Sequence, residues 1–283
     1  IDGIEVIRVW SYITSNSGFV KRVIDYISFG IMAFMVGLFK KHDLIIATSP
    51  QFFTTWAAWG LSKIKRKPWI FELRDLWPES IKTVGAMKQG KVIDILEKIE
   101  LGLYKSSNKV VAVTDAFKTN LINRGIDANK IEVVTNGSNV ELFSAREKNQ
   151  KLLKSLGLEN KFIIGYIGTH GMAHSLDFIV TSISKIEDKY IHFLFIGDGA
   201  MKEKVLEIAN NLKVKNATFL NPIKKEEVPE YLNICDVSLA PLKKEDNFKT
   251  VIPSKIFEAS AMRKPTLLGV EGQAQEIIET YNA

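Results

Sequence analysis

Short hydrophobic runs alternate with longer segments of helical periodicity along the whole chain of 283 residues. Alternation of this kind is typical of parallel β-sheets whose strands are joined by crossover helices. In the first half it predicts strands at 4–10, 43–48, 68–73, 108–113 and 131–134, and helices at about 18–39, 51–64, 89–105 and 115–124. Asn136-Gly137 then breaks the pattern.

The second half repeats the alternation. It predicts strands at 161–167, 190–196, 216–220, 236–240 and 265–269, and helices at 175–187, 200–212, 225–234, 254–263 and from about Gln273. The pattern therefore predicts an α/β protein of two doubly wound, Rossmann-like domains, covering residues 1–138 and 139–283.

The first predicted helix is unusually apolar. Its hydrophobic residues nearly encircle the segment from Val20 to Lys40, but the uninterrupted apolar stretch is about 14 residues, short of the roughly 20 that a membrane span needs. Two interpretations stay open: the helix is buried in its domain, or one face lies in a membrane interface.

Composition narrows the class of protein. The chain is 46% hydrophobic and 25% charged, which is ordinary for a globular protein. Its positive charge is concentrated in residues 1–145, above all in Lys63-Ile-Lys-Arg-Lys67. A basic surface suits nucleic acid, anionic lipid or phosphorylated substrates as partners. The alternative interpretation of the run at 63–67 is a solvated loop. The single cysteine, Cys235, excludes a disulfide within the chain and favours a reducing compartment. The four histidines are scattered, and no metal-ligand spacing is visible.

Three turns carry candidate chemistry in the second half. One strand runs into Gly168-Thr169-His170-Gly171, the next into Gly197-Asp198-Gly199, and a helix opens at Pro253 with Ser254, Lys255 and Glu258 in its first turns. Glycines allow close approach of a ligand, helix N-termini and a lysine attract anions, and a carboxylate accepts hydrogen bonds from a diol. Because parallel strands share one carboxyl edge, we expect the three turns to form a nucleotide-sugar site there. A capped surface helix is the simpler interpretation of 253–258 alone.

These segments, with others in the same order, resemble the retaining two-Rossmann glycosyltransferases of the GT-B architecture, family 4-like and of the WbuB-like branch. The other segments are Phe71–Ser80 with its core Arg74-Asp-Leu-Trp-Pro-Glu79, Val113-Thr-Asp, Val133–Gly137, Phe219–Ile223, Asp236–Leu242 and Arg263-Lys-Pro-Thr. The resemblance implies that the chain is a fragment, lacking the start of the first domain and the end of the second. It also implies transfer of a sugar from a UDP-sugar to a lipid-linked or saccharide acceptor in O-antigen or capsule assembly.

The resemblance assigns roles to single residues. Glu258 matches the second glutamate of an E-x7-E pattern and would bind ribose, whereas Thr250 replaces the first glutamate. Gly168, Thr169 and His170, with Ser254 and Lys255, would hold the diphosphate without a metal or other cofactor. Gly197 and Gly199 would line the nucleotide pocket, and Ile223 would lie at the base.

On the acceptor side we expect Asp75, supported by Arg74 and Glu79, to act as the catalytic group, although an ion pair or a helix cap would also explain Asp75. The resemblance implies a cytoplasmic protein, peripheral on the inner face of the membrane where its basic half meets anionic lipid, and no nucleic-acid partner. Two other functions stay open: a UDP-sugar epimerase of the same fold and a non-catalytic nucleotide-sugar-binding protein. Thr250 favours the second.

Overall fold

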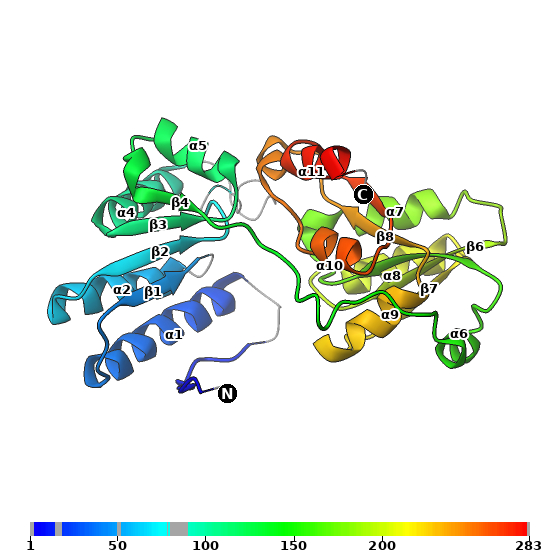
Figure 1. The fold of residues 1–283 in the computed structure, drawn as a ribbon, viewed down its shortest axis with the longest axis horizontal. Coiled ribbons are helices and arrows are strands. Elements are labelled where there is room, and N and C mark those ends of the chain that lie inside the picture. Colours follow the sequence, from blue (N-terminus) through cyan, green and yellow to red (C-terminus); the bar gives the residue numbers. More distant parts are fainter. Residues whose placement is uncertain (1–2, 15–18, 50–51, 78, 80–89, 282–283) are drawn as a thin grey trace. The chain divides into compact units, whose positions relative to one another are not determined.

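The computed structural model describes residues 3–14, 19–49, 52–77, 79 and 90–281. The chain forms two compact units, Ile1–Thr135 and Asn136–Ala283 (Figure 1). Each unit is an α/β layer structure built on its own parallel sheet, which confirms the fold class expected from the sequence.

Within the described residues, the first unit holds a four-stranded parallel sheet in the order β1-β2-β3-β4. Its strands are β1 (Ile45–Thr48), β2 (Trp69–Leu73), β3 (Lys109–Ala112) and β4 (Ile131–Val133). Its helices are α1 (Phe19–Phe39), α2 (Phe52–Lys65), α4 (Lys91–Ser106) and α5 (Asp115–Asn123). Alternate strand residues such as Trp69, Phe71 and Leu73 are buried, as expected where helices cover one face of a sheet.

The prediction of a strand at 4–10 is wrong. Residues 4–14 have no regular secondary structure, and Ile4 and Trp10 are 69% and 64% exposed. The segment is attached instead by side chains: Ser28 Oγ accepts from the Tyr12 backbone N–H at 2.8 Å, and Lys40 pairs with Glu5 at 2.7 Å. An alternating sequence becomes a strand only where a neighbouring strand supplies hydrogen bonds, and within the described residues β1 pairs with β2 alone.

Helix α1 is buried on one face only. It packs against α2 so closely that a Cβ on Gly30 would stand 2.9 Å from the Phe53 carbonyl oxygen. The opposite face exposes an apolar stripe of Val20, Ile24, Ile27, Ile31, Met35 and Phe39. No helix in the described part of the chain is long and apolar enough to cross a membrane.

The second unit holds, within the described residues, a five-stranded parallel sheet in the order β7-β6-β5-β8-β9. Its strands are β5 (Phe162–Ile167), β6 (Ile191–Ile196), β7 (Ala217–Leu220), β8 (Val237–Pro241) and β9 (Thr266–Gly269). Its helices are α6 (Gln150–Leu156), α7 (Leu176–Ile183), α8 (Lys202–Asn211), α9 (Val228–Ile234), α10 (Lys255–Ala261) and α11 (Gln273–Tyr281).

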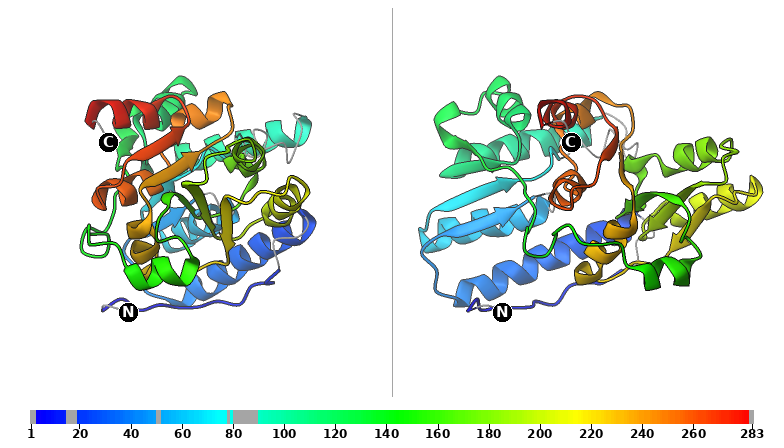
Figure 2. Two further views of the ribbon diagram at one scale, coloured as in Figure 1. Left: turned by 90° about the vertical axis from the view of Figure 1, so that its right-hand side faces the viewer. Right: turned by 45° about the vertical axis from the view of Figure 1, so that its right-hand side comes forward.

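The strand order creates a switch point in this sheet. From β5 the chain proceeds to β6 and β7 on one side, then crosses to β8 and β9 on the other. The helices consequently lie on both faces of the sheet, as the two views of Figure 2 show. Open α/β sheets bind ligands outside the carboxyl ends of the strands at such a point, here beside the ends of β5 and β8.

Buried side chains from both faces hold the sheet of the second unit between its helices. One core cluster includes Tyr166, Phe193, Phe195 and Val205, and another includes Ile163, Leu194 and Cys235. The Cys235 thiol is fully buried, and burial raises its pKa to about 12, as expected of a small hydrophobic residue rather than a reactive thiol.

Candidate functional site

The turns that follow β5 and β6 are locked together at the carboxyl edge of the second sheet. The Gly168 N–H donates to the Ile196 carbonyl at 2.9 Å, and the His170 N–H donates to the Asp198 carbonyl at 2.8 Å. Gly197 and Gly199 have φ of +143° and +154°, and a Cβ on Gly197 would overlap the Gly168 carbonyl oxygen. Only glycine fits here, so the two predicted glycine turns do lie side by side.

Lys255 brings its ammonium to the same place. Nζ lies 3.7 Å from the centre of the Tyr166 ring and 3.2 Å from the position of a Cβ on Gly168. It is buried and, within the described residues, donates to no acceptor. Burial lowers its pKa to about 7. A buried ammonium at a glycine turn with no hydrogen-bond acceptor among the described residues is a ready partner for an anion.

Two histidines border the ammonium. The ring centres of His170 and His174 lie 5.7 and 6.0 Å from that of Tyr166. His170 is fully buried, and neither of its ring nitrogens has a hydrogen-bond partner in the described part of the chain. Burial, with the charges of Lys202 and Lys255, lowers its pKa to about 4; burial and Lys255 do the same for His174. Both rings are therefore neutral at pH 7, and each can donate one N–H to a ligand.

Other predicted residues surround this centre. Glu258 follows Lys255 on α10; burial raises the pKa of its carboxyl group, while Lys225 and Lys255 lower it. Ser254 stands exposed at the N-cap of α10 and makes no capping hydrogen bond with its side chain. Thr169 accepts the Tyr166 hydroxyl with its carbonyl at 2.6 Å. Ile223 follows the end of β7, and its partly buried side chain packs against the core.

Two residues at this edge, Tyr166 and Lys202, were not predicted from the sequence. Tyr166 looked like one more strand residue, yet its ring supports the Lys255 ammonium. Lys202 begins α8, and its Nζ donates to the carbonyls of Gly197 at 3.1 Å and Leu220 at 2.9 Å. A lysine at a helix N-terminus opposes the helix dipole, which is the one signal that could have drawn attention to it.

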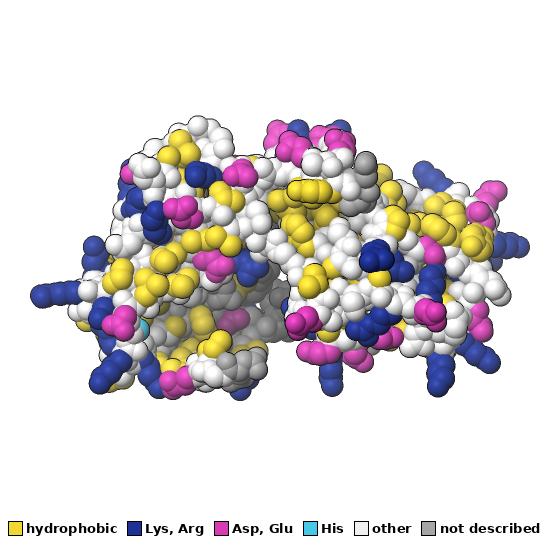
Figure 3. All heavy atoms as spheres, in the orientation of Figure 1, with side chains coloured by type: hydrophobic (Ala, Val, Ile, Leu, Met, Phe, Trp, Pro, Cys, Tyr) yellow, Lys and Arg dark blue, Asp and Glu magenta, His cyan; other side chains and the backbone are white. Residues whose placement is uncertain are grey.

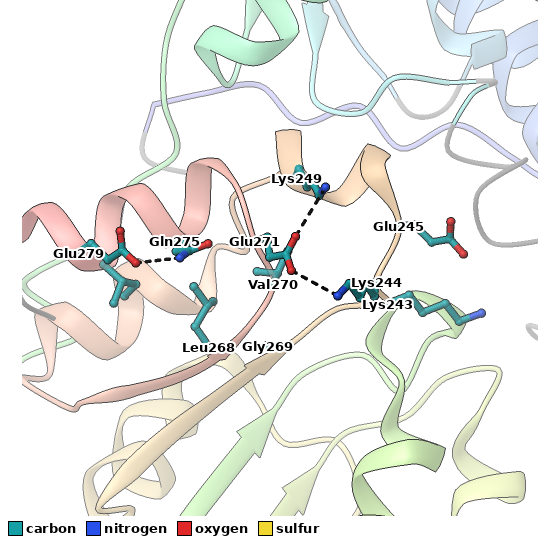
Figure 4. A pocket seen from close by; sticks show the side chains of 11 residues that line it. Lys243, Lys244, Glu245, Lys249, Leu268, Gly269, Val270, Glu271, Gln275 and Glu279 are labelled. Carbon is teal, nitrogen blue, oxygen red and sulfur yellow. Dashed lines mark hydrogen bonds and ion pairs between the residues drawn. The ribbon is translucent and has the colours of Figure 1, made fainter.

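A pocket of about 480 Å³ lies beyond β9, away from the glycine turns. It is lined by the end of β9, by α11 and by the segment from Lys243 to Lys249 (Figure 4). Glu271 bridges Lys244 and Lys249 at 3.6 Å each, closing one side. Thr250 stands in place of the expected glutamate, and its hydroxyl makes a local hydrogen bond, donating to the Asn247 carbonyl at 2.7 Å.

The predicted acceptor-side residues lie in the first unit, just beyond β2. Arg74 is exposed, and its backbone N–H donates to Ser49 Oγ at 3.2 Å. Asp75 and Glu79 are half-buried, and the Asp75 carbonyl accepts the Trp77 N–H at 3.0 Å. Pro78 and Ser80, the remaining predicted members of this segment, lie outside the described residues.

A buried polar cluster of Glu100, Tyr104 and Arg124 interacts electrostatically with Asp75 and Glu79. Glu100, only 1% exposed, accepts from the Tyr104 hydroxyl at 2.5 Å and from Arg124 Nη2 at 2.6 Å. The charge of Asp75 acts on Tyr104, and that of Glu79 acts on Arg124. Burial raises the pKa of Glu100 to about 7, against the opposing effects of Arg124 and Tyr104.

No group of three or more His, Cys, Asp or Glu side chains that could hold a metal ion occurs among the described residues.

Family comparisons match each half of the chain. Residues 161–282 match the family described as "Glycosyl transferases group 1", and residues 10–142 match "Glycosyltransferase Family 4".

Curated relatives are distant in sequence. The putative teichuronic acid biosynthesis glycosyltransferase TuaH of Bacillus subtilis is 25% identical over 200 residues, which are 70% of this chain and 49% of TuaH. The probable glycosyltransferase WbjE of Pseudomonas aeruginosa is 22% identical over 73% of this chain and 52% of its own length. The putative colanic acid biosynthesis glycosyl transferase WcaI of Escherichia coli is 22% identical, over 95% of this chain and 69% of WcaI. The chain thus spans about half the length of the first two.

Solved structures agree on the fold. The crystal structure of HepE from Anabaena in complex with UDP-glucose superposes with a TM-score of 0.73 at 17% identity, covering 93% of this chain and 67% of HepE. Sucrose-phosphate synthase of Thermosynechococcus elongatus gives 0.69 at 15% identity, covering 89% and 62%. Each half of the chain thus matches a glycosyltransferase family model, and the chain as a whole has the GT-B fold of these solved structures.

Proposed function

We propose that the protein transfers a sugar from a UDP-sugar, with retention, to a lipid-linked or saccharide acceptor in surface polysaccharide assembly, as a member of the WbuB-like branch. The names of TuaH and WcaI refer to teichuronic and colanic acid biosynthesis, which supports a role in surface polysaccharide assembly. HepE was crystallised with UDP-glucose, which supports a UDP-sugar as donor. O-antigen and capsule are the products that the resemblance suggests.

The observation that carries the proposal is the Lys255 ammonium. It is buried at the Gly168 turn, lacks an acceptor in the described part of the chain, and lies at the switch point of the sheet. Breaking a sugar–diphosphate bond builds negative charge on the leaving group. A fixed ammonium with little access to water stabilises that charge more in the transition state than in the ground state.

The rest of the donor site follows from the turns around Lys255. Thr169, Ser254 and the neutral His170 ring would add hydrogen bonds to the diphosphate. Glu258, one turn along α10, would accept the ribose hydroxyls. Gly197 and Gly199 would allow the nucleotide to approach the backbone, and the base would lie near Ile223.

On the acceptor side we assign Asp75 as the group that meets the acceptor hydroxyl, with Arg74 and Glu79 beside it. The Glu100–Tyr104–Arg124 cluster supports this assignment, because it places fixed charges and hydrogen bonds behind Asp75 and Glu79. The substitution Asp75→Asn is expected to lower kcat while leaving the affinity for UDP unchanged.

We further propose that the first unit lies on an anionic membrane surface, on the cytoplasmic side. The ends of α1 and α2 adjoin, since Lys65 Nζ donates to the Lys40 carbonyl at 2.5 Å. There the apolar stripe of α1 ends at Phe39, which is 84% exposed, beside a basic cluster: Lys40, Lys41, Lys63, Lys65, Arg66 and Lys67. On the face of this unit seen in Figure 3, hydrophobic side chains gather, with basic and acidic side chains scattered among them. Apolar area combined with basic charge favours anionic lipid.

One observation favours a different function, a non-catalytic nucleotide-sugar-binding protein. Thr250 replaces the glutamate expected at the donor sugar, and its hydroxyl is bonded to the Asn247 carbonyl. Such a protein would bind UDP tightly without hydrolysing or transferring the donor.

A donor screen tests the proposal. UDP release is followed with each of a panel of UDP-sugars and lipid-linked acceptors, using the full-length protein. Release that needs both donor and acceptor is the expected result. Epimerisation of the free donor, with no acceptor present, would point to the epimerase instead. If no UDP-sugar is turned over and Glu258→Ala leaves UDP affinity unchanged, the proposal is wrong.

A further inference from the structure

Strands β6 and β7 separate at their carboxyl ends, and Lys202 lies at the point where they part. The last backbone contact between them is a 3.3 Å hydrogen bond from the Gly197 N–H to the Leu220 carbonyl. Beyond it, the chain turns away through Asp198-Gly199 on one side and Asn221-Pro222 on the other. The Lys202 ammonium donates to both strand ends, at 3.1 Å to Gly197 and 2.9 Å to Leu220.

The position of Lys202 is costly for the protein. A cation in the first turn of a helix is disfavoured by the helix dipole. Partial burial also lowers the pKa of the ammonium, which shows that its charge is incompletely solvated. The cost is offset by the pair of charge-assisted hydrogen bonds, by the charge of Asp198 and by a contact with the Phe219 ring, whose centre is 5.9 Å from Nζ. A lysine without these contacts would not be stabilised at the N-terminus of α8.

We propose that Lys202 is a positioning residue for nucleotide-base recognition. It fixes the spacing of the Gly197–Gly199 and Asn221–Ile223 turns, between which the base of the donor would lie. This inference rests on the proposed UDP-sugar function and deepens it, by dividing the site into two parts. Lys255 serves the diphosphate, and Lys202 holds the base-binding turns.

This division makes a selective prediction. In Lys202→Met, the two carbonyls lose a charged donor and the turns lose their common anchor, so the affinity for UDP is expected to fall about tenfold, the size of one charged hydrogen bond. The affinity for inorganic pyrophosphate, which has no base, stays within about twofold of wild type. Lys202→Arg keeps a charged donor and recovers much of the UDP affinity. Simple destabilisation of the unit would weaken both ligands alike.

Lys204→Met is the matched control. Lys204 lies two residues along the same helix and pairs with Asp177 at 3.2 Å, with its side chain 57% exposed. Calorimetric titration of UDP and of pyrophosphate into wild type, Lys202→Met, Lys202→Arg and Lys204→Met gives all the affinities needed. Wild type that binds no UDP would refute the proposed function. If wild type binds UDP, two results would overturn the assignment of Lys202. One is an equal UDP affinity of Lys202→Met and wild type, and the other is a loss of pyrophosphate affinity as large as the loss of UDP affinity.

Discussion

Replacement of Lys255 by methionine is predicted to stabilise the free protein. The side chains are similar in length, so the change removes a buried charge without opening a large cavity. The ammonium has no hydrogen-bond acceptor among the described residues, and burial lowers its pKa from 10.5 to about 7. At about 1.4 kcal/mol per pH unit, keeping it charged costs the folded state about 5 kcal/mol at most. The lowered pKa of Lys255 already reflects its attraction to Glu258, and the contact with the Tyr166 ring returns about 0.5–2 kcal/mol, so the net gain for Met is about 3 kcal/mol.

The gain must depend on pH. Because the pKa of Lys255 is lower in the folded than in the unfolded chain, the unfolded chain binds more protons between pH 7 and 10.5. Wild-type stability therefore gains from this group as pH rises through that window. The advantage of Lys255→Met is largest at or below pH 7 and vanishes near pH 10.5.

Urea unfolding of both proteins at pH 6, 8 and 10 measures the difference. Lys154→Met, at an exposed position on α6, is the control and is expected to change the free energy of unfolding by less than about 0.5 kcal/mol at any pH. If Lys255→Met is less stable than wild type at pH 6, or equally favoured at pH 6 and 10, the ammonium is not buried without compensation and the reasoning fails.

Three further predictions concern other parts of the molecule. Gly197→Ala should lower the free energy of unfolding by about 2–4 kcal/mol, because its Cβ would overlap the Gly168 carbonyl at a φ of +143°; Gly137→Ala, with open space around it, should be nearly neutral in the same urea titration. Arg124→Met should cost about 3–5 kcal/mol by leaving Glu100 unpaired, and Glu100→Gln in that background should restore part of the loss; equal stability of the single and double variants would contradict the pairing. Co-sedimentation with vesicles containing anionic lipid should exceed that with neutral vesicles, fall with added salt, and weaken on replacing Lys63, Lys65 and Arg66 by Gln; binding indifferent to lipid charge would count against the membrane face.

The alternation of buried strands and helices could be predicted from the sequence because it is a local property. Parallel strands covered by helices must be short and hydrophobic, so the runs at Phe162–Ile167 and Ile191–Ile196 are apparent without a structure. The segment 4–10 looked the same and was mispredicted, because pairing depends on a neighbour that the sequence pattern does not reveal.

The residues of the candidate site also divide into those that the sequence pattern predicts and those that it does not. The glycine turns and Lys255 were recognisable because shared strand ends bring them together in any doubly wound sheet. The partners of these residues were not, since the contact of Tyr166 with Lys255 and that of Lys202 with Leu220 depend on tertiary packing. The acceptor-side assignment of Asp75, Arg74 and Glu79 stays a prediction.

The central claim is that Lys255 holds the diphosphate of a UDP-sugar. Calorimetric titration of UDP into wild type and Lys255→Met at pH 7 tests it most directly. Loss of a charge-assisted hydrogen bond to phosphate predicts UDP affinity reduced by about 10- to 150-fold in a variant that remains folded and is more stable than wild type. Equal UDP affinity of the two proteins would contradict the account.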